Sequence, residues 1–535
     1  MFRRIIYALI IIVSTTMSYA TAWAGSPRLV VNIVVGTLRN SDIDKYYDNF
    51  SEGGFRRLIE GGVRYNNTML DYANTSKPAG LATIATGSQP SIHGVVGEWW
   101  WNYIDSSIVS LIADNNAYSI PHSTGTGHYS AHRLHCPTIG DMLIAANANS
   151  MSCSIAIDPM SAILLTGKHG VAYWVENNQT HWTSSSAYIN HIPAWIEEYN
   201  RNDENAIYKF KRWTPLYPSS SYLNSEVAVL EGISNKGTTL ISNVDLNLDN
   251  SDIGAMRYTP AGNTMILQFA LSYIFKQGLG KDSNPDIINI CLDPAHYIAQ
   301  TYGPESMEYE DMIYRLDADL EEFLIKLYAQ FQKQSDVVVT ITSPHGTSPS
   351  YNPSEQPTHE RLNTRQMEVL VNAFLGARYG SDSYILGFAN KALYLNHNVI
   401  HSKHLNLNDI REEVATFVLQ MRGISNAISA TSMRNTSFAD GRSRLMQQSF
   451  YPTRSGDVII DLLPGWTIEQ QGIRSTSDAA YNYDRRVPLI IYSDYEPMVI
   501  NREVSMEALA PTLAHILGIE VPWATTTVPL SEFCD

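Results

Sequence analysis

The sequence predicts an α/β fold with a central, mostly parallel β-sheet. Short and nearly continuous apolar runs, rich in β-branched residues, recur along the chain, and amphipathic stretches lie between them. Such runs are typical of strands that are buried on both faces of a parallel sheet. The clearest runs cover residues 28–35, 286–291, 336–341 and 487–492.

The segments between the runs predict helices. Residues 310–329 and 409–421 carry apolar side chains at spacings of three and four, the pattern of a helix with one buried face. Buried strands that alternate with such helices indicate a layered α/β fold, in which catalytic groups gather at the carboxyl ends of the strands.

Two stretches interrupt this alternation. Residues 173–257 are rich in aromatic, Asn and Ser residues and have weak periodicity, which predicts a cap insertion beside the sheet. A polar loop at about 347–360 follows His345 and is expected to border the same end of the sheet.

The N-terminus predicts export. Arg3 and Arg4 precede an apolar stretch at 5–13, and Ala22-Trp23-Ala24 then offers a small-x-small cleavage site. The apolar stretch is shorter than the ~20 residues that span a bilayer, so we expect a cleaved signal peptide at 1–24 and not an anchor. The mature domain would cover 25–535, without a membrane span, in the periplasm or outside the cell.

The composition limits the partners. The 535-residue chain is 44% hydrophobic and 17% charged, as expected for a globular protein with a large core. Its net charge of −16 argues against nucleic acids and anionic membrane surfaces as partners.

The four cysteines form no CxxC pair, and Cys136 and Cys153 are the two closest in sequence. The sequence allows either a disulfide between these two or buried free thiols.

Several short motifs follow one another in a recognisable order. They include Gly53-Gly54-Phe55, Thr86-Gly87-Ser88, Ser91-Ile92-His93-Gly94-Val95, Thr259-Pro260-Ala261-Gly262-Asn263, Tyr302-Gly303-Pro304, Tyr483-Asp484 and Ala510-Pro511-Thr512. This series resembles the alkaline phosphatase superfamily, and most of all the secreted phosphatases of the phosphodiesterase/nucleotide pyrophosphatase branch. The resemblance extends from about residue 29 to residue 522. It implies a three-layer α/β sandwich with a central sheet and a cap.

The resemblance also implies a definite chemistry. Members of this superfamily hold two zinc ions about 4 Å apart, which clamp the attacking and leaving oxygens of an in-line displacement. A metal-activated Thr or Ser hydroxyl attacks phosphorus and forms a covalent intermediate. The metal pair needs carboxylate and imidazole ligands from the ends of several strands.

Most positions that should carry this machinery hold other residues. The bridging Asp after the first strand is matched by Gly36, and the nucleophile by Lys77, next to the hydroxyls of Thr75 and Ser76. A phosphate-binding Asn is matched by Glu98, whose carboxylate would repel a phosphate dianion. The Lys and Arg that contact phosphate in related phosphomonoesterases are matched by Asp158 and Met160.

The other zinc-ligand positions also differ. An Asp and a His four residues later are matched by His296 and Gln300, and an Asp-His pair by Pro344 and His345. A last His falls at or near Ser477. Only His345 keeps the expected ligand type, so the resemblance predicts that the zinc pair is lost and that no metal is bound.

These losses lead to the interpretation of an exported, non-catalytic pseudoenzyme, a binding or scaffolding module for an unknown protein or glycan. Lys77 would replace some of the missing cationic charge, and it would be either paired with Glu98 or solvated. Of Trp99, Trp100 and Trp101, either at least one is exposed to a sugar or a partner protein, or the cap insertion buries them. The alternative is an active metal-dependent phosphohydrolase, a phosphomonoesterase or phosphodiesterase, with a rebuilt site, such as a single metal near Asp293, His296 and His345 with Asp478 or Asp484 as further ligands. A lyase or transferase that uses Lys77 has no supporting constellation.

Overall fold

The computed structural model describes residues 26–121, 127–175, 181–202, 213–224, 253–351, 360–477 and 479–534. The predicted signal peptide at 1–24 and Asp478 lie outside these ranges, as do several parts of the predicted cap insertion. Within the described residues, no helix combines the length and the apolar character that crossing a membrane requires.

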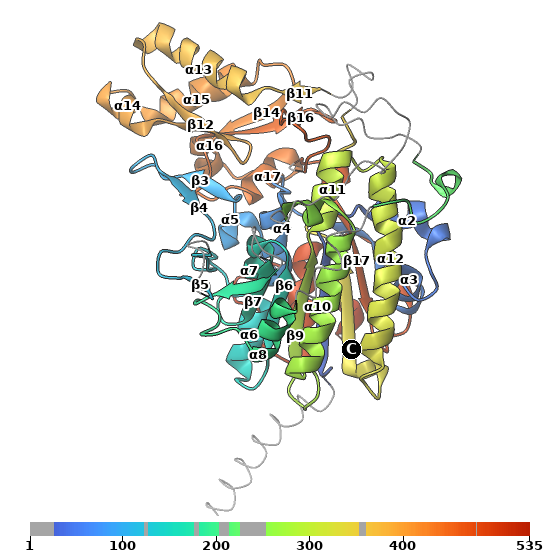
Figure 1. The fold of residues 1–535 in the computed structure, drawn as a ribbon. Helices are drawn as coiled ribbons and strands as arrows, with labels where there is room; N and C mark the ends of the chain where they lie inside the picture. The colour runs from blue at the N-terminus through green and yellow to red at the C-terminus, as the bar shows by residue number, and fades with distance from the viewer. Residues whose placement is uncertain are drawn as a thin grey trace, which may run out of the picture.

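A large sheet runs through the main body of the molecule (Figure 1). Its 11 described strands include a parallel centre, in which β1 pairs with β10 on one side and with β9 on the other. β17 is antiparallel to both of its neighbours, β10 and β2. In spatial order the strands are β18 (Met498–Ile500), β2 (Val63–Met69), β17 (Arg486–Tyr492), β10 (Val337–Thr342), β1 (Leu29–Val35), β9 (Asp286–Leu292), β6 (Ser152–Ala156), β7 (Val171–Val175), β8 (Trp182–Ser185) and β5 (Ser119–Ile120), with β19 (Val504–Ser505) also paired to β2.

Helices cover both faces of this sheet, which makes the three-layer architecture. In β1, Val31 and Ile33 face one hydrophobic core, whereas Val30 and Val34 face the other. The first core is closed by α2 (Asn40–Tyr46), α3 (Phe55–Gly61), α8 (Ala194–Arg201), α10 (Ala261–Gln277), α11 (Pro294–Tyr302) and α12 (Met307–Tyr328). The second is closed by α4 (Lys77–Thr86), α6 (Ile139–Ala146), α7 (Pro159–Thr166), α16 (Ala430–Asn435), α17 (Gly441–Gln448) and α19 (Leu509–Leu517).

A smaller lobe with its own core stands at one end of the main body (Figure 1). Its four-stranded sheet has the order β12 (Ile385–Ala389), β13 (Ala392–Leu395), β15 (Val458–Leu462) and β14 (Ile424–Ser429). The lobe also contains α13 (Thr364–Tyr379), α14 (His397–Ser402), α15 (Leu407–Val418) and the short pair β11 (Arg361–Leu362) and β16 (Thr467–Ile468).

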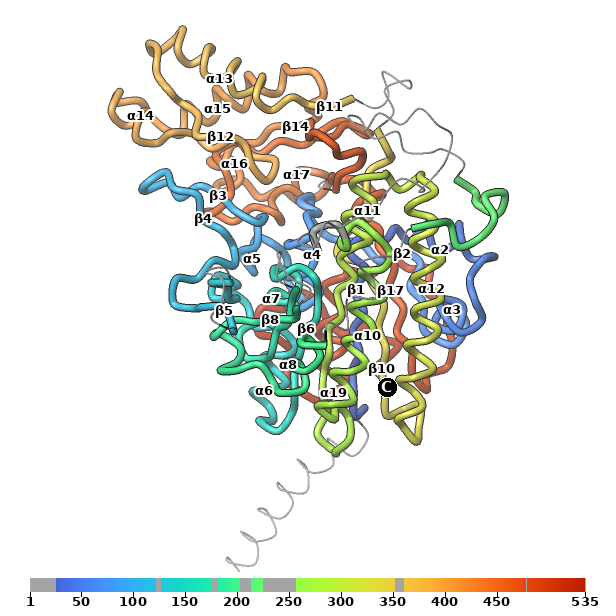
Figure 2. The backbone as a smooth tube through the Cα atoms, viewed as in Figure 1, coloured from blue at the N-terminus to red at the C-terminus, as the bar shows by residue number. Residues whose placement is uncertain are grey.

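The lobe rests on a hairpin of the main body. This hairpin consists of β3 (Trp99–Trp101) and β4 (Ile108–Ser110), and β12 packs against β3 (Figure 2). The contact is tight, because a Cβ atom at Gly387 would lie 2.4 Å from the ring of Trp101. Trp100 is buried and Trp99 and Trp101 are partly buried, so the expected exposed tryptophan is not found.

The fold confirms the predicted α/β class with a mostly parallel centre. The four predicted strands are β1, β9, β10 and β17, and the two predicted helices are α12 and α15. The predicted cap begins inside β7, a strand of the main sheet. The described cysteines are all free thiols, with Cys136, Cys153 and Cys291 buried, so no Cys136–Cys153 disulfide is present.

Candidate active site

The candidate site lies where three central strands end. β1 leads into Gly36 and Thr37, β9 into Asp293, and β10 into Pro344 and His345. The carboxyl ends of parallel neighbours meet at one edge of a sheet, so these residues from distant parts of the sequence come together there. α4 begins at the same edge and packs closely on Pro344, because a Cβ atom at Gly80 would lie 2.0 Å from the Pro344 carbonyl oxygen.

Lys77 is the charged centre of this edge. It is the first residue of α4, is only 6% exposed, and places its Nζ 2.8 Å from carboxylate oxygens of both Asp158 and Asp293. The expected pairing with Glu98 is therefore wrong: the carboxylates that Lys77 contacts are Asp158 and Asp293, and Glu98 lies exposed before β3.

Electrostatics keep Lys77 and Asp158 ionised. Burial by itself lowers the pKa of Lys77, but the attraction of Asp158 and Asp293 outweighs it and raises the pKa well above the ordinary value. Burial likewise raises the pKa of Asp158, yet the Lys77 charge and hydrogen bonds from Lys77 and Tyr297 bring it below its usual range. A buried charge that kept no partner would be strongly destabilising, so the three groups depend on one another.

A second cation and an aromatic ring flank the cluster. The Tyr297 hydroxyl donates to Asp158 over 2.5 Å. Two cations lie over its ring, Lys77 Nζ at 5.2 Å from the centroid and the Arg257 guanidinium at 5.3 Å. Burial lowers the pKa of Arg257, but Tyr297, Asp158 and Asp293 raise it overall. The Asp158 side chain is 21% exposed, so the cluster reaches the surface on this side.

Asp293 is fully engaged by protein groups. Its Oδ1 accepts from Lys77 and from the Ser161 hydroxyl at 2.6 Å, and its Oδ2 accepts from the Asp158 backbone N–H at 2.9 Å. Both carboxylate oxygens of Asp293 therefore have protein hydrogen-bond donors.

His296 and Thr37 form a hydroxyl–imidazole pair at the same edge. Thr37 Oγ1 lies 3.3 Å from His296 Nδ1. Burial, together with the charge of Lys77 and the neighbouring His345, lowers the pKa of His296 well below its ordinary value. The imidazole is therefore neutral near pH 7, and in the tautomer with its proton on Nε2 the Nδ1 atom accepts from the Thr37 hydroxyl, as the base does in an activated nucleophile pair. The sequence reasoning passed over Thr37, although it directly follows Gly36.

His345 lies beside this pair with a fixed tautomer. Its ring centroid is 5.1 Å from that of His296. The carbonyl oxygen of Gly346 contacts Nδ1, which must carry the proton because a carbonyl only accepts. Burial lowers the pKa of His345 to about 4, so Nε2 is a neutral acceptor. His345 Nε2 is one of several buried side-chain atoms of the described residues that have no hydrogen-bond partner.

The remaining predicted positions lie around this edge without adding ligands. Pro344 is buried, and the half-buried Gln300 accepts hydrogen bonds from Arg474 and Ser475 through its backbone carbonyl. Ser477 is half-buried in the loop before α18 (Asn482–Arg485). Thr75 is also buried, and its hydroxyl donates to the Ala479 carbonyl over 3.4 Å.

The residues present do not fit the zinc pair that the resemblance implies. A Cβ atom at Gly36 would lie 2.9 Å from the Leu292 carbonyl oxygen, so this backbone has no room for the bridging carboxylate. The ammonium of Lys77 already neutralises the two carboxylates nearest to it. In the part of the chain that the structure describes, no three His, Cys, Asp or Glu side chains gather into a metal-binding group.

Comparison with known proteins identifies the family. The model of the family "Type I phosphodiesterase / nucleotide pyrophosphatase" matches residues 30–478. The chain belongs to this family. It is 27% identical over 518 residues to "Alkaline phosphatase PafA" of Elizabethkingia meningoseptica, covering 95% of this chain and 94% of that protein. It is also 27% identical to "Alkaline phosphatase PhoV" of Synechococcus elongatus, covering 93% and 91% of the two chains.

Solved structures of the family share the fold along the whole chain. The crystal structure of wild-type PafA superposes with a TM-score of 0.88 at 26% identity, covering 95% of this chain and 99% of that one. These relatives are named as phosphatases, and the family as phosphodiesterases and pyrophosphatases. The interpretation as a non-catalytic binding or scaffolding module is therefore wrong, and so is the leaning against an enzyme. The alternative of a phosphohydrolase with a rebuilt site fits the family better.

Proposed function

We propose that this protein is a phosphoric ester hydrolase whose site has been rebuilt around Thr37, Lys77 and His296. The observation that carries the proposal is the similarity over about 95% of the chain to an alkaline phosphatase, in sequence and in fold. The Thr37–His296 pair supports it, because it supplies a nucleophile and a base at the edge of the sheet where such folds act.

In the proposed reaction Thr37 Oγ1 attacks phosphorus, and its proton passes to His296 Nδ1. The new O–P bond forms while the bond from phosphorus to the ester oxygen breaks, and the leaving alcohol takes up the proton that His296 received. Water then attacks the phosphorus of the phosphorylated threonine and gives a proton to His296, which returns it to Thr37; the product is phosphate from a monoester or a phosphate monoester from a diester. The Lys77 ammonium is balanced by Asp158 and Asp293, so the Arg257 guanidinium is the cation at this edge that would attract an anionic phosphoryl oxygen.

The charges at the surface favour diesters over monoesters. A phosphodiester carries one negative charge, whereas a monoester carries up to two at neutral pH. Asp158 is partly exposed at the edge of the cluster. Its carboxylate repels a dianion more strongly than a monoanion. We therefore expect a higher kcat/KM for a diester than for the matched monoester.

We further propose that this hydrolase works without the zinc pair, since Gly36 and Lys77 replace groups that the pair needs. The predicted signal peptide at 1–24 supports an exported enzyme, in the periplasm or outside the cell.

The test is hydrolysis of bis-p-nitrophenyl phosphate and p-nitrophenyl phosphate by the purified mature protein. We expect activity that falls at least tenfold in Thr37→Val and in His296→Ala, and that a chelator leaves unchanged. His401→Ala, at an exposed position of α14, is the matched control. Absence of hydrolysis of either ester would overturn the proposed function. Activity that a chelator removes and zinc restores would overturn only the zinc-free mechanism.

A further inference from the structure

A buried arginine joins the lobe to the main body. Arg454 lies in the connection between α17 and β15, and only 7% of it is exposed. Its guanidinium donates to the backbone carbonyls of Gly94 and Arg133 in the main body, and it lies 4.6 Å from the centre of the Trp100 ring. The fit is close, because a Cβ atom at Gly94 would lie 3.0 Å from Arg454 Nη1. On the lobe side, Tyr394 of β13 donates to the Arg454 carbonyl over 2.7 Å.

The charge of Arg454 is held without a carboxylate. In the part of the chain that the structure describes, no Asp or Glu forms an ion pair with this guanidinium. Burial lowers the pKa of Arg454 to about 10, which shows that its surroundings compensate the charge incompletely. The imidazole of His135 is its side-chain acceptor, because Arg454 Nη2 donates to His135 Nε2. A buried cation with so few acceptors depends on each of them.

His135 can accept this hydrogen bond only while its imidazole is neutral. A guanidinium has no acceptor atom, so Nε2 must be unprotonated and the proton of the neutral ring lies on Nδ1, 2.7 Å from the Tyr451 hydroxyl. Protonation of His135 places an N–H where the lone pair was, and it brings a second positive charge next to Arg454. His135 is exposed, so it exchanges protons freely with the solvent.

The surroundings of His135 favour its neutral form. Burial comes first among the causes that lower its pKa, and the charges of Arg454 and Lys168 add to it. Asp114 in the same region is already engaged by Ser130 and His132. The charged and titratable groups around His135 are Arg454 and Tyr451 after α17, His93 at the end of α5 (Pro90–His93), Lys168 after α7, and His132, Arg133 and Cys136 of its own segment.

The sign of the pH dependence follows from this lowered pKa. The neutral imidazole contributes stability that is fully present above the unfolded pKa of about 6.5. This stability is lost as the pH falls through the lower pKa of the folded state.

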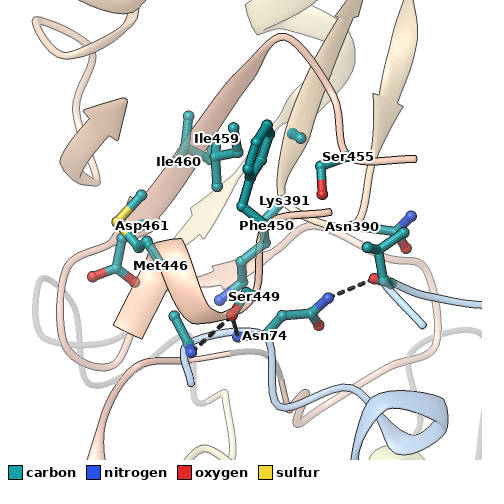
Figure 3. Close-up of a pocket in the computed structure, with 13 residues that line it drawn as sticks. Asn74, Asn390, Lys391, Met446, Ser449, Phe450, Ser455, Ile459, Ile460 and Asp461 are labelled. Carbon is teal, nitrogen blue, oxygen red and sulfur yellow. Dashed lines mark hydrogen bonds between the residues drawn. The ribbon is translucent and has the colours of Figure 1, made fainter. Parts of the chain in front are cut away.

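The neighbouring contacts at this junction do not titrate in the same range. Ser449 Oγ accepts the backbone N–H groups of Ala73 at 2.9 Å and Asn74 at 2.8 Å, as Figure 3 shows. Asn390 donates to the Trp99 carbonyl over 2.7 Å. These hydrogen bonds join uncharged groups, so acid leaves them unchanged.

A second histidine at the junction responds to acid in the opposite way. The ring of His397 stacks on Tyr103 with 4.2 Å between the ring centroids. His397 Nε2 lies 2.9 Å from a carboxylate oxygen of Asp457, so the protonated ring gains an ion pair. Acid therefore strengthens this contact and weakens the one between Arg454 and His135.

We propose that the contact between Arg454 and His135 is a pH-sensitive latch between the lobe and the main body, closed while His135 is neutral and open once it is protonated. The latch is a property of the fold that goes beyond the proposed hydrolysis and does not depend on it. Opening frees the Arg454 segment from the main body, while the separate cores of the lobe and the main body stay folded.

The experiment is hydrogen exchange of the full mature chain between pH 7.5 and pH 4.5, corrected for the intrinsic exchange rate at each pH. Residues 94–101 and 451–457 report on the latch, because the N–H groups of Ser455 and Asp457 are hydrogen-bonded there. We expect both segments to exchange at least tenfold faster at the acidic end, while β1 and β9 keep their protection. His135→Gln retains an uncharged acceptor and should remove this change, whereas His401→Gln, at an exposed position of α14, should keep it.

His135→Lys tests the latch without acid. Lysine is charged at neutral pH and has no acceptor, so this variant should show at pH 7.5 the fast exchange that the wild type shows at pH 4.5. The proposal is overturned if His135→Lys is as protected as the wild type at pH 7.5. It is also overturned if the two segments of the wild type stay protected in acid, if they open only together with β1, or if His135→Gln opens like the wild type.

Discussion

Gly36 and His296 pack so closely that a side chain at position 36 would collide with the backbone and Cβ of residue 296. A Cβ atom at Gly36 would lie 3.1 Å from the Cβ of His296 and 2.9 Å from the Leu292 carbonyl oxygen. The end of β1 thus packs directly on the first turn of α11, which carries the proposed base. The glycine is what brings Thr37 within 3.3 Å of His296.

We therefore expect Gly36→Ala to lower the free energy of unfolding by about 1–3 kcal/mol, because overpacking forces backbone shifts. The same shifts should lower kcat by disturbing the Thr37–His296 contact. Urea unfolding and initial rates measure the two effects. Gly376→Ala in α13 is the matched control, since a Cβ there would find only the Ser381 Cα at 3.8 Å. That control should be neutral or stabilising, as alanine is the better helix former.

Lys77 is expected to stabilise the fold as well as the site. Lys77→Met removes the cation between Asp158 and Asp293 and leaves two buried carboxylates close together. Breaking a buried ion pair from one side costs about 3–5 kcal/mol. Urea unfolding should show a loss of this size. Lys326→Met breaks the exposed pair with Glu322 and should cost less than about 1 kcal/mol. Equal losses in the two variants would contradict a buried network.

A third prediction concerns stability and pH. Burial raises the pKa of Glu507 to about 7, although the Thr526 hydroxyl donates to it. The folded protein therefore keeps a proton on Glu507 at pH values where the unfolded chain has lost it. Stability contributed by this proton is present below the unfolded pKa of about 4.3 and is lost as the pH rises toward 7.

We expect the free energy of unfolding to decrease between pH 5 and pH 8, and Glu507→Gln to reduce this decrease. Glu503→Gln, at an exposed position, is the control and should leave the pH profile unchanged. Urea titrations at several pH values measure the slope. A profile that is identical for Glu507→Gln and the wild type would contradict a protonated Glu507.

Much of the fold was predictable from local pattern. The strands β1, β9, β10 and β17 are buried on both faces of the sheet. Strands of this kind have continuous apolar sequences, which made them recognisable. The lobe with its own core from Leu362 to Ile468 was not predicted, because its helices and strands resemble those of the main body. Nothing local indicates that they pack on a separate sheet.

The location of the site could be predicted from the sequence, but the contacts between its residues could not. The strand ends located Lys77, His296 and His345, yet the partners of Lys77 lie at Asp158 and Asp293, far away in the sequence. Whether the Lys77 ammonium contacts these carboxylates or Glu98 depends on how α4 packs on the sheet. The local sequence does not indicate this packing. The pairing of Thr37 with His296 was missed for the same reason.

The last prediction tests the zinc-free mechanism by reinstating a hydroxyl at the start of α4. Lys77→Thr places a hydroxyl there, but it also removes the cation that neutralises Asp158 and Asp293. It adds no carboxylate at Gly36 or Pro344, and two carboxylates alone seldom hold zinc, which takes three or four protein ligands. Residues of one catalytic unit act together, so one reinstated member should add nothing.

We therefore expect Lys77→Thr to bind less than one zinc ion per chain by elemental analysis and to show no zinc-dependent gain in hydrolysis. Metal binding should require the combined change of Gly36→Asp, Lys77→Thr, His296→Asp, Gln300→His, Pro344→Asp and Ser477→His. A side chain at position 36 would meet the Leu292 carbonyl oxygen and the backbone N and Cβ of residue 296, so the Gly36 change also requires a backbone shift. A clear zinc-dependent rate in the single variant would mean that a metal site already exists at this edge. Hydrolysis by the wild type would then still stand, but Thr37 and His296 would no longer be sufficient to explain it.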